Sequence, residues 1–281
     1  MLKSAFNYFL YTSIFISLCA IVMVAQTNFL FQLDYEKKIF YAFVFSATIC
    51  SYNFHWYLTP FSASDPESGR NGWNHQHRKL VFALFLAGLV ASVIFGWPLR
   101  EHWLAVSVGV AATFFYTAPK IPLNSFRKIK KFALGKTIFL SFVWMYVTSA
   151  LPILVSGTKW EISHTLFCSS RFFLIYAICI LFDYRDREGD LKQGIKSMIT
   201  MFNEKNITRL FLIAMLIFYL STLGLYFYGF SALSISNLSI PGLVILAIYN
   251  YSRKHFGDYL YYFFLDGMMM ASSLFTLFLR I

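Results

Sequence analysis

The stretch TLFCSSRFFLIYAICILF, residues 165–182, is an almost unbroken apolar run in which Arg171 is the only charged residue. A helix needs about twenty mainly apolar residues to cross the roughly 30 Å hydrocarbon core of a membrane. With this run, nine such segments lie approximately at residues 6–25, 39–58, 80–97, 103–118, 132–155, 165–182, 210–230, 238–251 and 259–279. The sequence therefore predicts an all-α, polytopic transmembrane bundle of about nine helices, in a single domain over residues 1–281.

The composition of the chain also favours a protein embedded in lipid. Its 281 residues are 58% hydrophobic and only 13% charged, which is rare in a water-soluble domain of this length. Residues 1–25 hold one lysine and a long apolar core, so we expect a retained first helix rather than a cleaved signal peptide. The four cysteines lie in apolar runs without metal-binding spacing, which indicates buried side chains rather than zinc ligands or disulfides.

Positive charge predicts the orientation of the helices, because lysine and arginine are retained on the cytoplasmic side during insertion. If the N-terminus is cytoplasmic, eighteen of the 24 lysines and arginines fall at the N-terminus or in the even-numbered loops, and only five fall on the opposite face. We therefore expect a multi-pass protein of the cytoplasmic (inner) membrane, with its N-terminus and polar loops in the cytoplasm. Topology largely explains the net charge of +11, so no nucleic-acid partner is expected.

The segment DYRDREGDLKQGIKS, residues 183–197, follows directly from the sixth apolar run. If the helix continues, Asp183, Asp186 and Asp190 project from one face, because they stand at positions i, i+3 and i+7. Hard carboxylate oxygens suit Mg²⁺, which typically binds one or two carboxylates together with substrate phosphates. The basic residues between them are suited to bind the same phosphates. A solvated helix end held by acid–base pairs is the alternative interpretation.

Two further polar segments lie on the same predicted side of the membrane. Tyr116 and Lys120 have YxxxK spacing, and Pro119 helps to end the fourth helix there. A lysine at a helix end can contact an anion, but a positive-inside loop with an interfacial tyrosine explains the pattern equally well. Asn53 and His55 are polar groups near the membrane boundary at the end of the second span, where they suggest a cavity or a partner.

Two ionisable residues lie deeper in the predicted bundle. Asp266 is eight residues into the ninth span, roughly 12 Å along the helix from its start, and Arg171 lies within the sixth. A charged residue inside a membrane is a functional hypothesis by default. The alternatives are a mutually satisfied structural pair and an acid that faces a cavity.

Together, these motifs resemble those of the UbiA-type intramembrane prenyltransferases. The segment DYRDREGDLKQGIKS is similar to the second aspartate-rich motif of that family, DxxDxxxD followed by a Gly-x-x-Thr/Ser element, and residues 116–120 match its YxxxK motif. The order and spacing of the motifs agree from the second span through the sixth. The resemblance implies a UbiA-like bundle, which agrees with the nine expected helices.

The resemblance also implies a mechanism. A prenyl diphosphate would lie in a lateral membrane cavity, with Mg²⁺ bridging its diphosphate to two aspartate-rich motifs, and ionisation would give an allylic cation that alkylates a lipophilic acceptor. By this resemblance, the catalytic metal ligands would be Asp183, Asp186 and Asp190. The contacts to the diphosphate would be Tyr116, Lys120 and Lys196.

One half of the family pattern is missing. Where the family has NDxxDxxxD at the end of the second helix, this chain has Asn53, Phe54 and His55. Losing half of a Mg²⁺ clamp removes roughly several kcal/mol of leaving-group stabilisation unless another group replaces it. Asn53 and His55 are the candidates for weaker contacts to the diphosphate, and Asp65 could fold back towards the site.

The leading hypothesis is therefore a membrane prenyltransferase-like enzyme that uses Mg²⁺ and a prenyl diphosphate and that contacts membrane lipids. The missing motif supports a competing hypothesis, a non-catalytic isoprenoid- or lipid-binding membrane protein, or a partner subunit, derived from the same family. A small-molecule transporter is disfavoured, because the charged residues crowd one face and few lie at the midplane.

Overall fold

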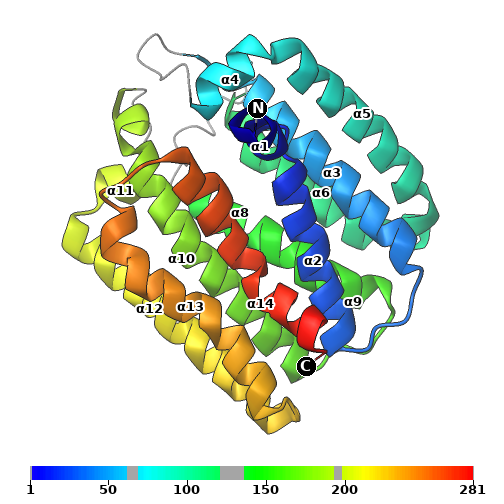
Figure 1. Ribbon diagram of the computed structural model, residues 1–281. Helices are drawn as coiled ribbons and strands as arrows, with labels where there is room; N and C mark the ends of the chain where they lie inside the picture. Colours follow the sequence, from blue (N-terminus) through cyan, green and yellow to red (C-terminus); the bar gives the residue numbers. More distant parts are fainter. Residues whose placement is uncertain (1, 62–68, 121–135, 193–197, 281) are drawn as a thin grey trace.

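The computed structural model describes residues 2–61, 69–120, 136–192 and 198–280. All the regular structure in these ranges is helical, as the sequence predicts (Figure 1). The α-helices are α1 (Leu2–Tyr11), α2 (Ile14–Leu30), α3 (Lys37–Tyr57), α4 (Arg70–Gln76), α5 (Arg78–Gly96), α6 (Trp103–Thr117), α8 (Lys136–Met145), α9 (Leu151–Val155), α10 (Ile162–Lys192), α11 (Met198–Met201), α12 (Glu204–Gly224), α13 (Ala232–Ser252) and α14 (Asp266–Leu279). Short 3₁₀ or π segments adjoin several of them: η1 (Trp97–His102), η2 (Ala118–Lys120), η4 (Tyr146–Ala150), η5 (Leu225–Tyr228) and η6 (Leu260–Leu265).

Within these described ranges, six helical stretches are long and apolar enough to cross a membrane, or seven if the bent pair α1 and α2 counts as one span. The six are Arg78–Thr117, Thr137–Val155, Ile162–Glu188, Glu204–Tyr228, Ala232–Ser252 and Leu260–Leu279. The polytopic helical fold is thus confirmed, but the predicted count of nine is not. The first stretch contains two of the expected spans, α5 and α6 joined through η1, and α3 is not among the six.

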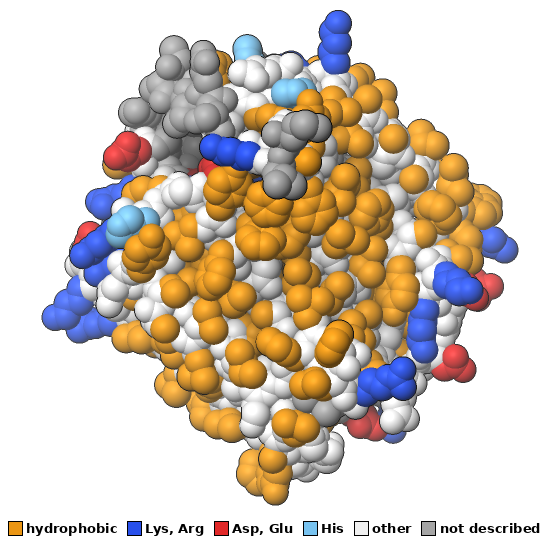
Figure 2. All heavy atoms as spheres, viewed as in Figure 1, with side chains coloured by type: hydrophobic (Ala, Val, Ile, Leu, Met, Phe, Trp, Pro, Cys, Tyr) orange, Lys and Arg blue, Asp and Glu red, His pale blue; other side chains and the backbone are white. Residues whose placement is uncertain are grey.

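Apolar side chains on the surface are consistent with contact to lipid. On α5, Val90, Val93 and Ile94 are 59%, 63% and 59% exposed. Figure 2 shows hydrophobic side chains across the middle of one face, with Lys, Arg, Asp and Glu towards its margins. A large contiguous apolar surface is unfavourable in water, so in a folded protein it usually contacts a membrane or a binding partner.

The first predicted span, residues 6–25, is not one straight helix, because α1 and α2 meet at an angle of 60°. Ser13 takes a left-handed backbone conformation with φ of 67°, which is unfavourable for a residue with a Cβ. Asn53 Nδ2 donates a hydrogen bond to the Thr12 carbonyl, and Arg70 Nη2 donates one to the Ser13 hydroxyl, each at 3.1 Å. Contacts from α3 and α4 therefore hold the break.

Other helices differ from the expected spans mainly in length. The helix α10 runs well past the expected end at residue 182, so the acidic segment continues the helix. The helix α13 begins six residues before the expected start at residue 238 and passes through Pro241. The expected fifth span, residues 132–155, begins outside the described residues and is interrupted by the π segment η4. The ends of these helices were not predictable from the apolar pattern alone, because polar residues can continue a helix beyond its apolar run.

A buried polar network ties α2, α10 and α14 together in the half of the bundle away from the N-terminus. Arg171 donates hydrogen bonds to the Met269 carbonyl at 3.0 Å and to Ser273 Oγ at 3.1 Å. Ser273 in turn donates to Gln26 Oε1 at 2.8 Å. The suggested pairing of Arg171 with Asp266 is therefore wrong, because the guanidinium is held by a carbonyl and a hydroxyl on the next turns of α14.

The helices α3 and α5 pack closely against each other at Gly88. A Cβ at this position would lie 2.7 Å from the Cys50 backbone nitrogen and 3.0 Å from the Ser46 carbonyl oxygen. Because backbone atoms cannot yield as a flexible side chain can, we expect Gly88→Ala to lower the free energy of unfolding by about 1–3 kcal/mol. Equilibrium denaturation in detergent micelles measures this change.

Gly267→Ala is the matched control for this prediction. A Cβ at Gly267 would meet only the Phe15 ring, at 3.6 Å, which is an ordinary contact. We therefore expect this variant to be as stable as the wild type or slightly more stable, because alanine favours a helix over glycine. Equal losses of stability in the two variants would show that the close contact at Gly88 has no special role.

Candidate functional site

Predicted site residues are carried by the ends of α3 and α10, which lie at the end of the bundle where the N-terminus and α4 are found (Figure 1). Six of them have described side chains: Asn53, His55, Tyr116, Lys120, Asp183 and Asp186. For Asp190 the structure describes only its place in α10, and Lys196 and the alternative acid Asp65 lie outside the described residues.

The two described carboxylates of the acidic motif sit in different environments on α10. Asp183 is 5% exposed and accepts a hydrogen bond from Thr137 Oγ1 of α8 at 2.5 Å. The Asp186 side chain is 33% exposed and forms an ion pair with Arg185 at 3.1 Å. A neighbouring helix thus orients one carboxylate, while a neighbouring arginine on the same helix pairs with the other.

The donor chemistry of this motif fits Mg²⁺. Carboxylate oxygens are hard ligands, and Mg²⁺ usually takes one or two of them beside waters and substrate phosphates. In the part of the chain that the structure describes, no group of three His, Cys, Asp or Glu residues is placed to hold a metal. Asp183 and Asp186 supply two suitable carboxylates on one helix, and Asp190 follows one turn later in the same helix.

The YxxxK motif docks onto the end of α3. The Tyr116 ring stacks on His55, with centroids 5.1 Å apart and an interplanar angle of 14°. Lys120 Nζ donates a hydrogen bond to Thr59 Oγ1 at 2.5 Å and lies 5.7 Å from the centroid of Trp56. The structure thus brings His55 of the second predicted span together with Tyr116 and Lys120 of the YxxxK motif.

Asn53 has a different position from His55. It is 1% exposed, and its Nδ2 donates hydrogen bonds to the Thr12 carbonyl at 3.1 Å and to the Ile49 carbonyl at 2.8 Å. Its Oδ1 has no hydrogen-bond partner. The amide nitrogen therefore stabilises the break between α1 and α2, and only the amide oxygen is available for another hydrogen bond.

Cation–π contacts join the two halves of the site, a feature that the sequence did not indicate. Tyr262 of η6 contacts two guanidinium groups, with its centroid 4.6 Å from Arg70 and 4.4 Å from Arg185. Arg70 also lies 4.4 Å from the centroid of Trp56. Because Trp56 adjoins Lys120 and Arg185 pairs with Asp186, these contacts connect the YxxxK motif to the acidic motif.

The backbone of α4 is anchored at this cluster by a carboxylate. Asp258 Oδ2 accepts a hydrogen bond from the Arg70 backbone N–H at 2.7 Å and another from the Tyr11 hydroxyl at 3.0 Å. Burial lowers the pKa of the Arg70 guanidinium, and the neighbouring Tyr262, Asp266, Tyr52 and Asp258 act in the opposite direction. Arginine stays protonated near neutral pH even so, so α4 carries a buried positive charge.

Asp266, the deep acid noted in the sequence, belongs to the same neighbourhood. It begins α14, is 8% exposed, and follows Tyr262 by four residues. The charges of Arg70 and Arg185 act on its carboxylate. Asp266 therefore offsets part of the positive charge of the cluster, in place of the suggested pairing with Arg171.

Sequence reasoning counted Arg70 only as one of the charges that set the topology, and it did not single out Trp56, Asp258 or Tyr262. A signal was present in residues 69–74, GRNGWN, where an arginine stands between glycines and close to a tryptophan. Such a segment is unusual for a loop that only carries positive charge. Its burial, however, follows from contacts with residues nearly two hundred positions away, which no local pattern encodes.

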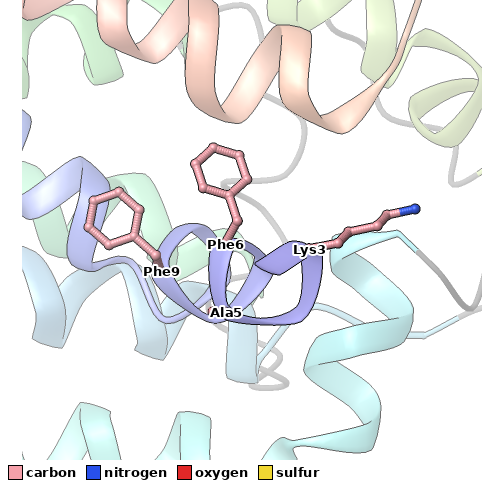
Figure 3. Close-up of a pocket in the computed structure, with 4 residues that line it drawn as sticks. All are labelled: Lys3, Ala5, Phe6 and Phe9. Carbon is pink, nitrogen blue, oxygen red and sulfur yellow. The ribbon is translucent and has the colours of Figure 1, made fainter. Parts of the chain in front are cut away.

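An open hollow on α1 shares no residue with this cluster. It is lined by Lys3, Ala5, Phe6 and Phe9 (Figure 3). The Phe6 ring contacts Tyr259 and Phe263, with centroids 5.7 Å and 5.1 Å away. One lysine and three apolar side chains provide no carboxylate for a metal, so the hollow suits an apolar chain and not a Mg²⁺ diphosphate.

Comparisons with known proteins agree with this architecture. A sequence model of the UbiA prenyltransferase family matches residues 74–265, more than half of the chain. Among solved structures, the apo structure of a UbiA homolog from Aeropyrum pernix K1 is similar, with a TM-score of 0.69 and 14% sequence identity over 93% of this chain and 98% of that chain. At this identity the similarity shows a shared fold. No curated protein matches the sequence.

Proposed function

This chain belongs to the UbiA prenyltransferase family, and from that premise we propose that it transfers a prenyl group from a prenyl diphosphate to a lipophilic acceptor with the help of Mg²⁺. The polytopic helical fold supports a membrane prenyltransferase-like protein. The observation that carries the finer proposal is that cation–π contacts link the half of the site with Lys120 to the half with Asp186. A diphosphate needs cations and metal-binding carboxylates side by side, and this cluster provides both.

In this proposal the diphosphate lies between α10 and η2. The acidic motif, Asp183, Asp186 and Asp190, would hold Mg²⁺, which when bound would neutralise charge on phosphate oxygens. As the bond between the first prenyl carbon and the diphosphate oxygen breaks, Lys120 donates hydrogen bonds to the departing group, with Tyr116 and Lys196 as further contacts. Charge-assisted hydrogen bonds of this kind are stronger than neutral ones, so they favour departure.

The bond cleavage leaves an allylic cation, which the aromatic side chains around the site are suited to stabilise. Trp56 and Tyr262 already lie against guanidinium groups, so the prenyl cation would use aromatic ring faces that these arginines leave uncovered. Attraction to a ring face is worth about 2 kcal/mol or more when the cation is desolvated. The acceptor then forms a bond to the prenyl carbon and loses a proton, and the diphosphate leaves as the second product.

Binding and turnover assays test this proposal. Purified full-length protein in lipid nanodiscs is given Mg²⁺ and prenyl diphosphates of several chain lengths, with a membrane lipid extract as the source of acceptor. We expect at least one prenyl diphosphate to bind and to release pyrophosphate, and we expect EDTA to suppress that release. If no prenyl diphosphate binds and none releases pyrophosphate, the proposal has lost its basis.

One observation favours a second candidate, a non-catalytic isoprenoid-binding membrane protein or partner subunit. The last turns of α3, residues 53–57, contain no carboxylate, and the Asn53 nitrogen is used for the break between α1 and α2. A triple variant with Asn at positions 183, 186 and 190 separates the two functions. Loss of pyrophosphate release in this variant supports the enzyme, whereas unchanged isoprenoid binding and unchanged function in cells support the binding protein.

A further inference from the structure

The short helix α4 presents two buried polar side chains towards the end of α3. Arg70 and Asn74 are one helical turn apart, at i and i+4, and therefore share a face. They are only 3% and 6% exposed. Both lie beside Trp56, because Arg70 is 4.4 Å from its ring centroid and Asn74 lines a narrow crevice with it. The crevice also includes Thr59, the partner of Lys120.

The Arg70 guanidinium is incompletely satisfied by protein groups. Its Nη2 donates a hydrogen bond to Ser13 Oγ at 3.1 Å, but its Nε has no partner. Among the described residues, no carboxylate lies within ion-pair distance of this guanidinium, since Asp258 bonds to the Arg70 backbone N–H instead. Asp266 and Asp258 act on this charge from a distance, but no described carboxylate is paired directly with the guanidinium, so its free N–H groups are suited to receive an anion.

Asn74 gives a second, independent indication of a ligand. Neither its Nδ2 nor its Oδ1 has a hydrogen-bond partner, although the residue is buried. Buried amides almost always find partners, because an unmade hydrogen bond away from water is unfavourable. The crevice that Asn74 lines therefore has an unused donor, and it is also lined by Arg78 and by Thr59, which Lys120 contacts.

We propose that Arg70 and Asn74, together with Lys120, bind the diphosphate group directly and replace the metal-bridged carboxylates that are missing at the end of α3. This inference rests on the proposed function above. A guanidinium fork matches phosphate oxygens with paired hydrogen bonds, and the Asn74 amide donates one more. The site is then asymmetric: the diphosphate would be bound through Mg²⁺ on the α10 side and directly by side chains on the α4 side.

The carboxylates that face Arg70 are compatible with this arrangement. Asp258 fixes the position of the helix through the backbone, and Asp266 acts on Arg70 and Arg185 from α14. Neither forms an ion pair with the Arg70 guanidinium among the described contacts. A diphosphate therefore does not need to displace a carboxylate in order to reach it.

Direct binding predicts that part of the affinity for a diphosphate is independent of metal. Full-length protein in nanodiscs is titrated with inorganic pyrophosphate and with a non-hydrolysable prenyl thiodiphosphate, each in EDTA and in Mg²⁺. We expect the wild type to bind both ligands in EDTA and to bind them more tightly in Mg²⁺. If the wild type binds with Mg²⁺ but not at all in EDTA, the proposal is overturned.

Substitutions assign this metal-independent binding to α4. Arg70→Gln is expected to weaken binding in EDTA by about tenfold or more, because it removes a charged hydrogen-bonding fork. Asn74→Ala is expected to weaken it by about threefold to tenfold, because one hydrogen bond is lost. The double variant Asp183→Asn/Asp186→Asn should lose only the gain that Mg²⁺ provides. If the Arg70 and Asn74 variants bind like the wild type in both media, the proposal is wrong.

Two further variants keep the test decisive. If Arg70→Gln does not fold, Arg70→Lys and Asn74→Ala are measured instead. Lysine keeps the positive charge but lacks the planar guanidinium, so Arg70→Lys should bind the diphosphate with intermediate affinity. Arg253→Gln is the control for general positive charge, because Arg253 follows α13 and interacts with Tyr184 and Tyr249, away from α4; we expect it to bind like the wild type. Equal weakening by Arg253→Gln would overturn the assignment to α4.

This test can fail separately from the proposed function. If pyrophosphate binds through Arg70 and Asn74 but no prenyl diphosphate is turned over, prenyl transfer is wrong and direct binding stands. If a prenyl diphosphate is turned over while both α4 variants bind normally, prenyl transfer stands and direct binding is wrong.

Discussion

An Asp186→Asn variant is expected to lose prenyl transfer almost completely, with kcat/KM reduced by about 1000-fold because several kcal/mol of charge stabilisation is removed. Asparagine keeps the size of the side chain but removes the negative charge that holds Mg²⁺. The effect should be large because this carboxylate is a proposed Mg²⁺ ligand and is 33% exposed, whereas Asp183 is 5% exposed and accepts a hydrogen bond from Thr137. Pyrophosphate release with saturating Mg²⁺ measures the loss.

Glu188→Gln is the matched control for this variant. Glu188 lies on the same helix, two residues further along, and is exposed. We expect Glu188→Gln to retain nearly wild-type turnover, because a solvated surface carboxylate contributes little. Binding of Mn²⁺, followed by electron paramagnetic resonance, should weaken in Asp186→Asn alone. Turnover within a factor of about two of the wild type in Asp186→Asn would contradict a role for this carboxylate in metal binding.

A Lys120→Met variant is expected to reduce kcat by about 100-fold, the usual result of removing one donor that stabilises charge developing in a transition state. Methionine keeps much of the length of the side chain, so packing against Trp56 at the end of α3 should survive. Because Lys120 is proposed to act on the departing diphosphate, kcat should fall more than KM rises. Steady-state kinetics with a fixed prenyl diphosphate separates these two quantities.

Thr59→Val shows whether the position of this lysine matters. Thr59 Oγ1 accepts the Lys120 hydrogen bond and donates one to the His55 carbonyl at 2.8 Å. Valine has a similar shape and leaves the lysine in place, so we expect a smaller loss of about tenfold in kcat, equivalent to one displaced hydrogen bond. If Lys120→Met has no larger effect than Thr59→Val, the lysine has no direct contact with the leaving group.

Much of the helical architecture could be predicted from the sequence, because lipid imposes a simple constraint on long apolar runs. The segments that became α10, α12 and α14 were identified from their hydropathy, and the structure has helices there. The break between α1 and α2 could not be identified. Serine and threonine are common inside membrane helices, and the left-handed conformation of Ser13 depends on hydrogen bonds from Asn53 and Arg70, which lie far along the chain.

The candidate site was partly predictable for a related reason. The acidic motif is local, so the spacing of Asp183 and Asp186 was enough to place both on one face of a helix. Arg70 could not be distinguished in this way, since an arginine in a loop between membrane spans is the ordinary result of topology. Only its burial against Trp56 and Tyr262, which come from two different segments, shows that it belongs to the site.

The ties between α2 and α14 restrict the order in which the bundle can be completed during synthesis. Gln26 Nε2 donates to Thr276 Oγ1 at 2.7 Å across a separation of 250 residues, and Ser273 donates to Gln26. Likewise, Tyr11 bonds to Asp258. While the ribosome is still making the intervening helices, these early polar groups have no native partner inside the membrane. The bundle therefore closes only when α14 inserts, and until then the nascent chain depends on lipid, water or the insertion machinery to shield them.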